Sequence, residues 1–127
     1  TEGTDVTLIA TGLLVGEAIK AAELLKNEGI SVRVINMATI KPLDKEIVAK
    51  AAAETGLIVT AEEHSIIGGL GSAVAEAVCE STPVPVVRVV RPGGGAAGGF
   101  RPVRRQSDRP RPGRDGAQTE IKRTRIR

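Results

Sequence analysis

Residues 61–71, which read Ala-Glu-Glu-His-Ser-Ile-Ile-Gly-Gly-Leu-Gly, join a short apolar segment to a segment with helical spacing. The apolar residues 57–61 before the junction are typical of a buried parallel strand. Free N–H groups at a glycine-rich helix start can hold an anion, although the spacing is not the G-x-G-x-x-G of dinucleotide-binding turns. The junction therefore predicts a strand-turn-helix unit whose turn packs closely against the sheet, another subunit or a ligand.

The same strand-then-helix pattern recurs on both sides of this junction. Apolar runs predict strands, and 3.6-residue periodicity predicts helices, over these ranges: strands 6–11, 32–37, 57–61 and 84–90, helices 15–27, 45–55 and 72–80. Asp44 is a predicted cap, and Gly29 and Gly56 are predicted helix stops. The alternation predicts an α/β fold with a mostly parallel sheet covered on both faces.

Charge divides the chain into two unlike parts. Up to Val90 there are seven Lys and Arg against 12 Asp and Glu, a net charge of −5; from Arg91 onward 11 basic and three acidic residues give +8, so the whole chain carries +3. Residues 91–127 are rich in Arg, Gly and Pro and lack the apolar residues needed to offset the entropy cost of ordering. We predict a domain over 1–90 and a disordered basic tail over 91–127.

Cysteine use and hydropathy indicate the compartment. Cys79 is the only cysteine, so the chain can form no internal disulfide, which favours a reducing, cytoplasmic setting. Its place in an amphipathic helix predicts a buried, inert thiol. There is no apolar run of about 18 residues for a membrane span and no signal-peptide pattern. The first residue is Thr1, so we expect the chain to begin inside a longer protein.

His64, the only histidine, follows the third predicted strand, at the end of a parallel sheet where ligands commonly bind. It is either a general base or phosphate contact, or a hydrogen-bonded interface residue. The side chains of Glu62 and Glu63, which are adjacent, would point to opposite faces of a strand. They are therefore poorly placed to act together as a general acid and a general base. The sequence has no second His and no second Cys to complete a metal site. We predict no catalytic, cofactor-binding or metal-binding residue, and a candidate interface or ligand site formed by Glu63, His64, Gly68, Gly69 and Gly71.

Three stretches, in this order, carry a resemblance to a known family. They are residues 5–12 (Asp-Val-Thr-Leu-Ile-Ala-Thr-Gly), 35–44 (Ile-Asn-Met-Ala-Thr-Ile-Lys-Pro-Leu-Asp) and 60–72 (Thr-Ala-Glu-Glu-His-Ser-Ile-Ile-Gly-Gly-Leu-Gly-Ser). They resemble the C-terminal domain of transketolases, deoxyxylulose-phosphate synthase and the β subunits of 2-oxoacid dehydrogenases, and in particular the C-terminal subunit of a split transketolase. The resemblance implies a three-layer α/β/α domain with a mixed sheet.

The resemblance also implies which parts of the enzyme lie elsewhere. In this family thiamine diphosphate and a divalent metal such as Mg²⁺ sit between two other domains, which supply the cofactor contacts. The chain would then be a structural and dimerisation domain of an enzyme that transfers ketol groups between sugar phosphates, inactive alone and binding no cofactor. Its partners would be the thiamine-diphosphate-binding and pyrimidine-binding domains or subunit, with which it would form a homo- or hetero-oligomer. We expect no interaction with a membrane.

The tail departs from the family pattern. Family members continue after the last strand with Asp-Arg-Phe-Gly-x-Ser and a final helix. Residues 101–108, Arg-Pro-Val-Arg-Arg-Gln-Ser-Asp, can be written in the codons CGA CCG GTT CGG CGA CAG TCC GAC. Read from the second base, these codons give Asp-Arg-Phe-Gly-Asp-Ser-Pro. We infer a frameshift near residues 90–95, which would remove the final helix of the family. We expect the loss of that helix to expose an apolar face of the sheet, so that the chain aggregates or depends on a partner.

Two other functions fit the sequence. The Arg/Gly-rich tail could make the chain a nucleic-acid-binding module that holds phosphates without sequence preference. Phe100 is the only aromatic residue, so the chain has only one side chain that could stack on a nucleic-acid base. Any nucleic-acid binding would therefore be an incidental effect of the basic tail. A stand-alone α/β domain that binds a small ligand is the other alternative, because fold alone does not determine function.

The frameshift inference predicts the coding DNA itself. Read in the shifted frame, the DNA for residues 101–108 should encode Asp-Arg-Phe-Gly-Asp-Ser-Pro. Sequencing the gene in all three frames checks this, and any other peptide in the shifted frame would disprove the inference.

Overall fold

In the computed structural model, which describes residues 1–91 and 101–102, strand β1 (Val6–Ala10) lies inside a mixed sheet with the order β2-β1-β3-β4-β5. The other strands are β2 (Val32–Asn36), β3 (Ile58–Glu62), β4 (Val86–Val90) and β5 (Arg101–Pro102). β1 pairs in parallel with β2 and β3, and β3 pairs in parallel with β4. β5 is antiparallel to β4. The predicted mostly parallel, mixed sheet is confirmed.

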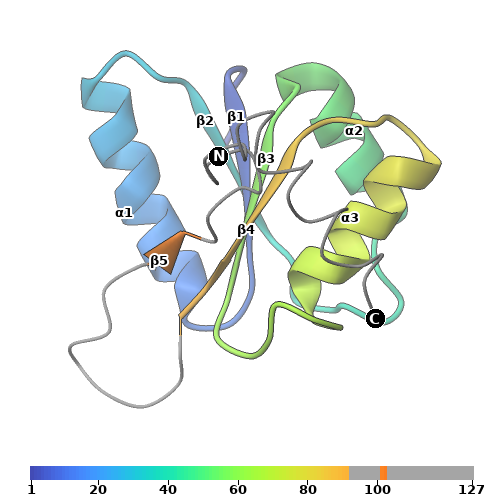
Figure 1. The fold of residues 1–127 in the computed structure, drawn as a ribbon. Coiled ribbons are helices and arrows are strands. Elements are labelled where there is room, and N and C mark those ends of the chain that lie inside the picture. Colours follow the sequence, from blue (N-terminus) through green and yellow to red (C-terminus); the bar gives the residue numbers. More distant parts are fainter. Residues whose placement is uncertain (92–100, 103–127) are drawn as a thin grey trace, which may run out of the picture.

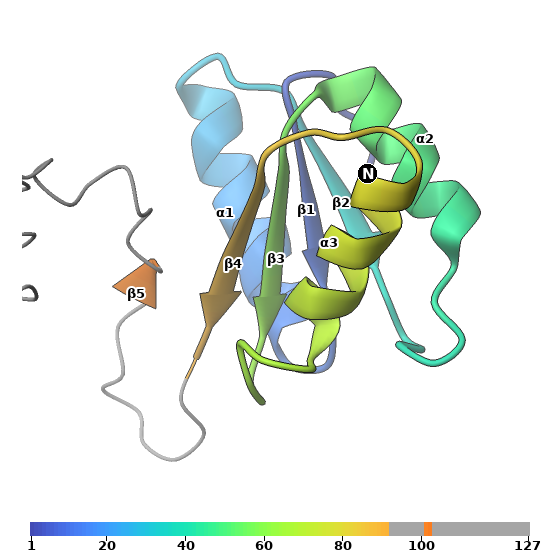
Figure 2. The ribbon, with the colours of Figure 1, turned by 45° about the vertical axis from the view of Figure 1, so that its right-hand side comes forward.

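Three helices cover the two faces of this sheet (Figures 1 and 2). α1 (Leu14–Asn27) lies on one face, and α2 (Lys45–Thr55) and α3 (Leu70–Glu80) lie on the other. Each helix connects two parallel strands, the arrangement that parallel pairing requires. The predicted α/β/α layering is therefore confirmed.

Helix α2 shows how local sequence sets the element boundaries. Asp44 caps its start, with Oδ1 accepting a 3.1 Å hydrogen bond from the Ile47 N–H. Gly56 ends it in the left-handed conformation, with φ of 65°.

An exposed ion pair of 2.8 Å joins Lys45, at the start of α2, to Glu80, at the end of α3. This hydrogen bond lowers the pKa of Glu80 and raises that of Lys45.

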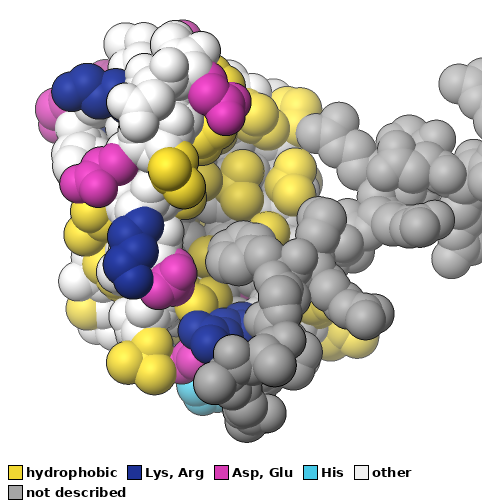
Figure 3. Space-filling model, turned by 90° about the vertical axis from the view of Figure 1, so that its left-hand side faces the viewer, with side chains coloured by type: hydrophobic (Ala, Val, Ile, Leu, Met, Phe, Trp, Pro, Cys, Tyr) yellow, Lys and Arg dark blue, Asp and Glu magenta, His cyan; other side chains and the backbone are white. Residues whose placement is uncertain are grey.

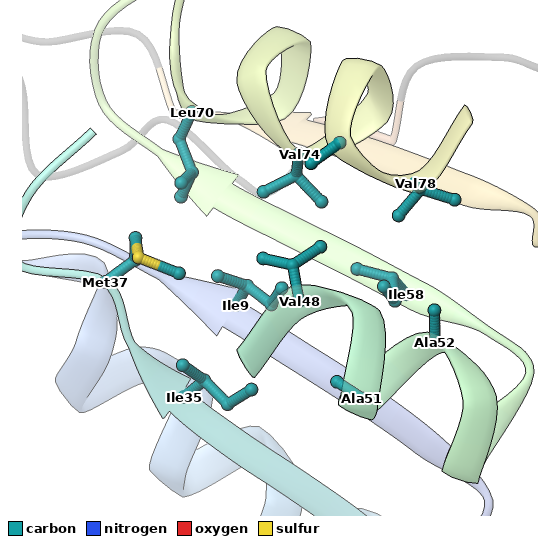
Figure 4. Packing of buried hydrophobic residues seen from close by; sticks show 11 residues of the cluster. Ile9, Ile35, Met37, Val48, Ala51, Ala52, Ile58, Leu70, Val74 and Val78 are labelled. Carbon is teal, nitrogen blue, oxygen red and sulfur yellow. The ribbon is translucent and has the colours of Figure 1, made fainter. Parts of the chain in front are cut away.

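The larger hydrophobic core lies between the sheet and the α2–α3 layer (Figure 4). Its buried residues come from three strands, two helices and the segment after β2: Ile9, Ile35, Met37, Val48, Ala51, Ala52, Ile58, Leu70, Val74, Ala77 and Val78. The core under α1 is smaller, with the buried residues Ala10, Leu14, Ala18 and Ala61. The two faces of the sheet are therefore covered unequally.

The α1 side of the domain displays hydrophobic side chains at its surface (Figure 3). Leu13 and Leu24 are 75% and 66% exposed, and Ile19 is 42% exposed. Val87 of β4 is only half-buried, because α1 covers only part of this face of the sheet. Such a surface is typical of a domain that packs against a further element or subunit.

Two details of the sequence prediction for α3 were wrong. Cys79 is exposed rather than buried, because the inward side of α3 is formed by other residues. The helix also begins at Leu70, two residues before the predicted start. The carboxylate that extends the helix to Leu70 comes from the preceding strand and is described below.

Most of the predicted tail lies outside the described residues, together with the nucleic-acid-binding alternative that rests on it. Arg91 is described, and its N–H donates a 2.9 Å hydrogen bond to the Glu62 carbonyl. Arg101 and Pro102 form β5, a strand that the sequence did not predict. Among the helices of the described residues, none has the length and apolar character needed to cross a bilayer.

Replacement Ile58→Ala should destabilise the domain by about 2–5 kcal/mol, because Ile58 is fully buried between β3 and the α2–α3 layer and its truncation leaves a cavity. Urea unfolding measures the loss. The matched control Ile67→Ala, at a side chain that is 86% exposed, should change stability by less than about 0.5 kcal/mol. Equal effects of the two substitutions would contradict the described core.

Candidate functional site

The last residue of β3, Glu62, places a buried carboxylate against the start of α3. Its side chain is only 2% exposed. The Leu70 N–H donates to Oε2 at 3.0 Å, and the Gly71 N–H donates to Oε1 at 2.9 Å. A negative charge at a helix N-terminus is favoured by the unpaired N–H groups and by the helix dipole. The carboxylate thus ties β3 to the first turn of α3 and explains why the helix starts at Leu70.

Glu62 changes the interpretation of the predicted anion-holding turn. The sequence indicated that N–H groups near the glycines could hold an external anion. In the structure two of these groups are occupied by the chain's own carboxylate. The residue that sequence reasoning missed was therefore Glu62, which was considered only as half of an acid–base pair. An acidic residue at a strand end, eight and nine residues before a helix start rich in glycine, is the pattern that could have identified it.

Two positions in the loop favour glycine for different reasons. A Cβ on Gly69 would lie 2.1 Å from Glu62 Oε2 and 2.4 Å from the Ser65 carbonyl oxygen, so no side chain fits there. Gly68 has φ of 76°, a conformation that favours glycine. The glycine signature of the sequence is thus explained by tight packing of the loop on β3 and α3, which was one of the two interpretations offered.

Side-chain hydrogen bonds fix the remainder of the loop. The Ser72 hydroxyl donates to the Ile66 carbonyl at 3.0 Å and accepts from the Gly68 N–H at 3.0 Å. Arg88 of β4 donates from Nη1 to the same Ile66 carbonyl at 3.0 Å. The Ile67 N–H donates to the Ser65 hydroxyl at 3.2 Å. Residues 65–68 are therefore held by both α3 and β4, although they form no regular structure.

The fixed loop presents four of the five predicted site residues at or near the surface. His64 and Gly68 are exposed, Glu63 and Gly69 are half-buried, and Gly71, in the first turn of α3, is buried. Ile67 between them is 86% exposed, and Leu13, in the turn after β1 at the same end of the sheet, is 75% exposed. Glu62, whose two oxygens accept hydrogen bonds from α3, is buried, whereas His64 is exposed. The arrangement suits contact with another polypeptide better than proton transfer.

The described residues do not fit a thiamine diphosphate or metal site. The two N–H groups at the start of α3 that could hold a phosphate already bind Glu62. Within residues 1–91 and 101–102, no three His, Cys, Asp or Glu side chains lie close enough together to hold a metal ion. No chemical step of such a cofactor can be derived from this part of the chain.

Comparisons with known proteins agree with this geometry. Residues 1–99 match the family described as "Transketolase, C-terminal domain". The 6-deoxy-6-sulfo-D-fructose transketolase subunit SqwH of Clostridium sp. (strain MSTE9) is 54% identical over 88 residues, which are 69% of this chain and 27% of that protein. A subunit of the apulose-4-phosphate transketolase of Phocaeicola vulgatus is 52% identical over 85 residues, 67% of this chain and 27% of that protein.

A solved structure is similar in both fold and sequence. It is described as "Split gene transketolase, inactive beta4 tetramer", with a TM-score of 0.70 and 53% identity, and the match covers 72% of this chain and 30% of that one. The 1-deoxy-D-xylulose-5-phosphate synthase of Heliobacterium modesticaldum is 55% identical over 75 residues, 59% of this chain and 12% of that protein. The match therefore spans only 12–30% of the length of the relatives named here.

The three-layer α/β/α arrangement, the buried glutamate and the glycine-fixed loop define an α/β domain, and in the named relatives the matching segment is part of a longer chain. With the family match over 1–99 and the relatives' identities, the assignment becomes specific. This chain belongs to the transketolase C-terminal domain family.

Replacement Glu62→Gln should destabilise the domain by about 1–3 kcal/mol, because an amide loses the charge and turns an N–H donor toward one of the two helix N–H groups. Urea unfolding monitored by circular dichroism measures the change. The matched control Glu63→Gln, at the half-buried neighbour, should alter stability by less than about 0.5 kcal/mol. A Glu62→Gln variant as stable as the control would show that the carboxylate does not hold α3.

Proposed function

We propose that this chain is the C-terminal structural and dimerisation domain of a thiamine-diphosphate-dependent, transketolase-like enzyme of the cytoplasm. The complete enzyme transfers ketol groups between sugar phosphates, and the isolated chain is inactive. The family membership and the relatives named as transketolase subunits support this assignment. The single observation in the structure that carries it is a loop fixed by buried bonds whose apolar tip, Ile67, contacts solvent.

The loop surface provides the proposed contact with the cofactor-binding part of the enzyme. Ile67 and Leu13 supply exposed apolar area at the carboxyl end of the sheet, and His64, in the same loop as Ile67, supplies an exposed polar group. Interfaces combine apolar anchors with polar groups that fix orientation. Glu63, His64, Gly68 and Gly69 form the proposed contact surface, and Gly71 supports it from below.

The partner proposed for this surface is the part of the enzyme that binds thiamine diphosphate and its pyrimidine ring. That part would supply the cofactor contacts and Mg²⁺, as the resemblance to the family implies. The less covered α1 side, with Leu24 and Ile19 exposed, offers a second apolar surface for assembly into homo- or hetero-oligomers. A similar chain is named as an inactive tetramer of a split-gene transketolase. This supports the proposal that the present chain assembles with other subunits and is inactive alone.

A domain exchange with a known relative tests the proposal. In the Clostridium subunit SqwH, the 88 matching residues are replaced by those of this chain. The chimera should assemble with the other part of that transketolase and retain activity. Introducing Ile67→Asp should lower activity by about tenfold or more, since burying a new charge at an interface is costly. Activity and sedimentation measured together separate loss of assembly from loss of chemistry.

Ala53→Asp is the matched control in the same chimera, because Ala53 is exposed on the last turns of α2, at the opposite end of the sheet from the loop. Its activity should equal that of the unmodified chimera. A folded chimera that never assembles, or equal activity of the Ile67→Asp and Ala53→Asp forms, would contradict the proposal. Thiamine diphosphate binding by the purified chain alone would favour the stand-alone ligand-binding alternative.

A further inference from the structure

One flank of α1 carries four exposed side chains in a single row. They follow one another at intervals of four, three and four residues, which places them on the same side of the helix. The first of them precedes α1 directly and already has helical backbone angles, so it continues the row by one position. The row is called the Leu13–Leu24 stripe and consists of Leu13, Glu17, Lys20 and Leu24.

The stripe has apolar ends and a charged centre. Leu13 and Leu24 are the two most exposed large apolar side chains on the α1 side. Between them, Lys20 Nζ lies 3.0 Å from Glu17 Oε1, and the two side chains are 71% and 46% exposed. An ion pair this exposed contributes little to the stability of a single helix. Both charged groups therefore have room for a further partner from outside the domain.

The stripe lies on the flank of α1 that faces away from β2. Ile19 and Lys26 line a groove of about 430 Å³ together with Val32 of β2, so their flank of the helix adjoins β2. With 3.6 residues per turn, the stripe lies about 130° around the helix axis from Ile19. It is therefore on the flank toward β4, where Val87 is half-buried and hydrophobic side chains reach the surface of the domain (Figure 3).

The order of side chains in the stripe is self-complementary under a two-fold axis. When two copies of α1 lie antiparallel about the midpoint between residues 18 and 19, residues equally far from that midpoint lie side by side. Leu13 then faces Leu24 of the second copy, and Glu17 faces Lys20 of the second copy. By symmetry each contact occurs twice. Two leucine pairs would flank a centre of four charges that alternate in sign.

The same charges disfavour the parallel arrangement. In a parallel pair of α1 helices in register, Glu17 would face Glu17 of the second copy and Lys20 would face Lys20. Contacts between like charges are unfavourable, whereas contacts between opposite charges fix orientation and register. The sequence of the stripe thus selects one direction and one register for a second copy.

We propose that the Leu13–Leu24 stripe docks a second copy of this chain, through antiparallel pairing of the two α1 helices about a two-fold axis. The inference rests on the proposed function for the view that the α1 side is an assembly surface, and it names the occupant of that surface. Burial of the leucine pairs supplies affinity, and the charged centre supplies orientation. Because the contact is small, we expect a weak dimer whose population depends on concentration.

Exchange of charges between two variants of the full chain tests both the occupant and the register. Glu17→Lys places lysines at both central positions, and Lys20→Glu places glutamates at both. Each variant alone should self-associate about tenfold or more weakly than the unmodified chain, because like charges then meet at the two-fold axis. An equimolar mixture should form a heterodimer, because each lysine then faces a glutamate. Sedimentation equilibrium over a range of concentrations measures this, and circular dichroism checks folding.

Lys26→Glu is the matched control, since it makes the same charge reversal on the other flank of α1. Its self-association should equal that of the unmodified chain. Leu24→Asp should abolish self-association, because it would bury a new charge against Leu13 of the second copy. Unchanged self-association of the Glu17→Lys and Lys20→Glu variants, or a mixture of them that forms no heterodimer, would overturn the proposal.

Two further outcomes would assign the stripe to another occupant. A chain that is monomeric until residues 103–127 are deleted would assign the stripe to its own C-terminal segment and overturn the inference. A chain that stays monomeric at all concentrations, while the chimera of subunit SqwH assembles and is active, would also overturn it and would leave the proposed function intact.

Discussion

The carboxylate of Glu62, bonded to the N–H groups of Leu70 and Gly71, is the interaction on which the structure at the carboxyl end of the sheet depends. It accepts hydrogen bonds from two otherwise unpaired N–H groups at the buried start of α3. Because the bond joins β3 directly to α3, the residues between them must form a short loop whose course is set by the two elements. Gly69 is the residue that lets this loop pass the carboxylate without a clash.

The same interaction separates the buried part of the glycine motif from its exposed part. Glu62, Gly69 and Gly71 form the buried or half-buried part and hold the loop in place. His64 and Ile67 lie on the exposed side of the same loop. A fixed and partly apolar surface loses little entropy on binding, which favours specific docking. The core under α1 is the smaller of the two, and Leu24 and Ile19 on that side are exposed, which gives the domain a second apolar surface.

The fold was largely predictable from the sequence because each element carries its own physical pattern. Apolar β-branched runs marked β1 to β4, and Asp44 with Gly56 marked both ends of α2. The role of Glu62 was not predictable in this way, because its partners are backbone groups eight and nine residues away that become neighbours only when α3 packs on β3. The exposure of Cys79 was missed for a similar reason: periodicity gives a helix face, but only packing decides how far that face extends. β5 follows a glycine-rich stretch without any strand pattern, so pairing with β4 rather than propensity defines it.

A crystal structure of the chain bound to the cofactor-binding part of a transketolase would test the central claim most directly. The account predicts that Ile67 and His64 are buried in the interface while both Glu62 hydrogen bonds remain as they are in the isolated domain. A complex in which the 63–69 loop stays in solvent, or in which Glu62 leaves α3 to contact the partner or its cofactor, would contradict the account.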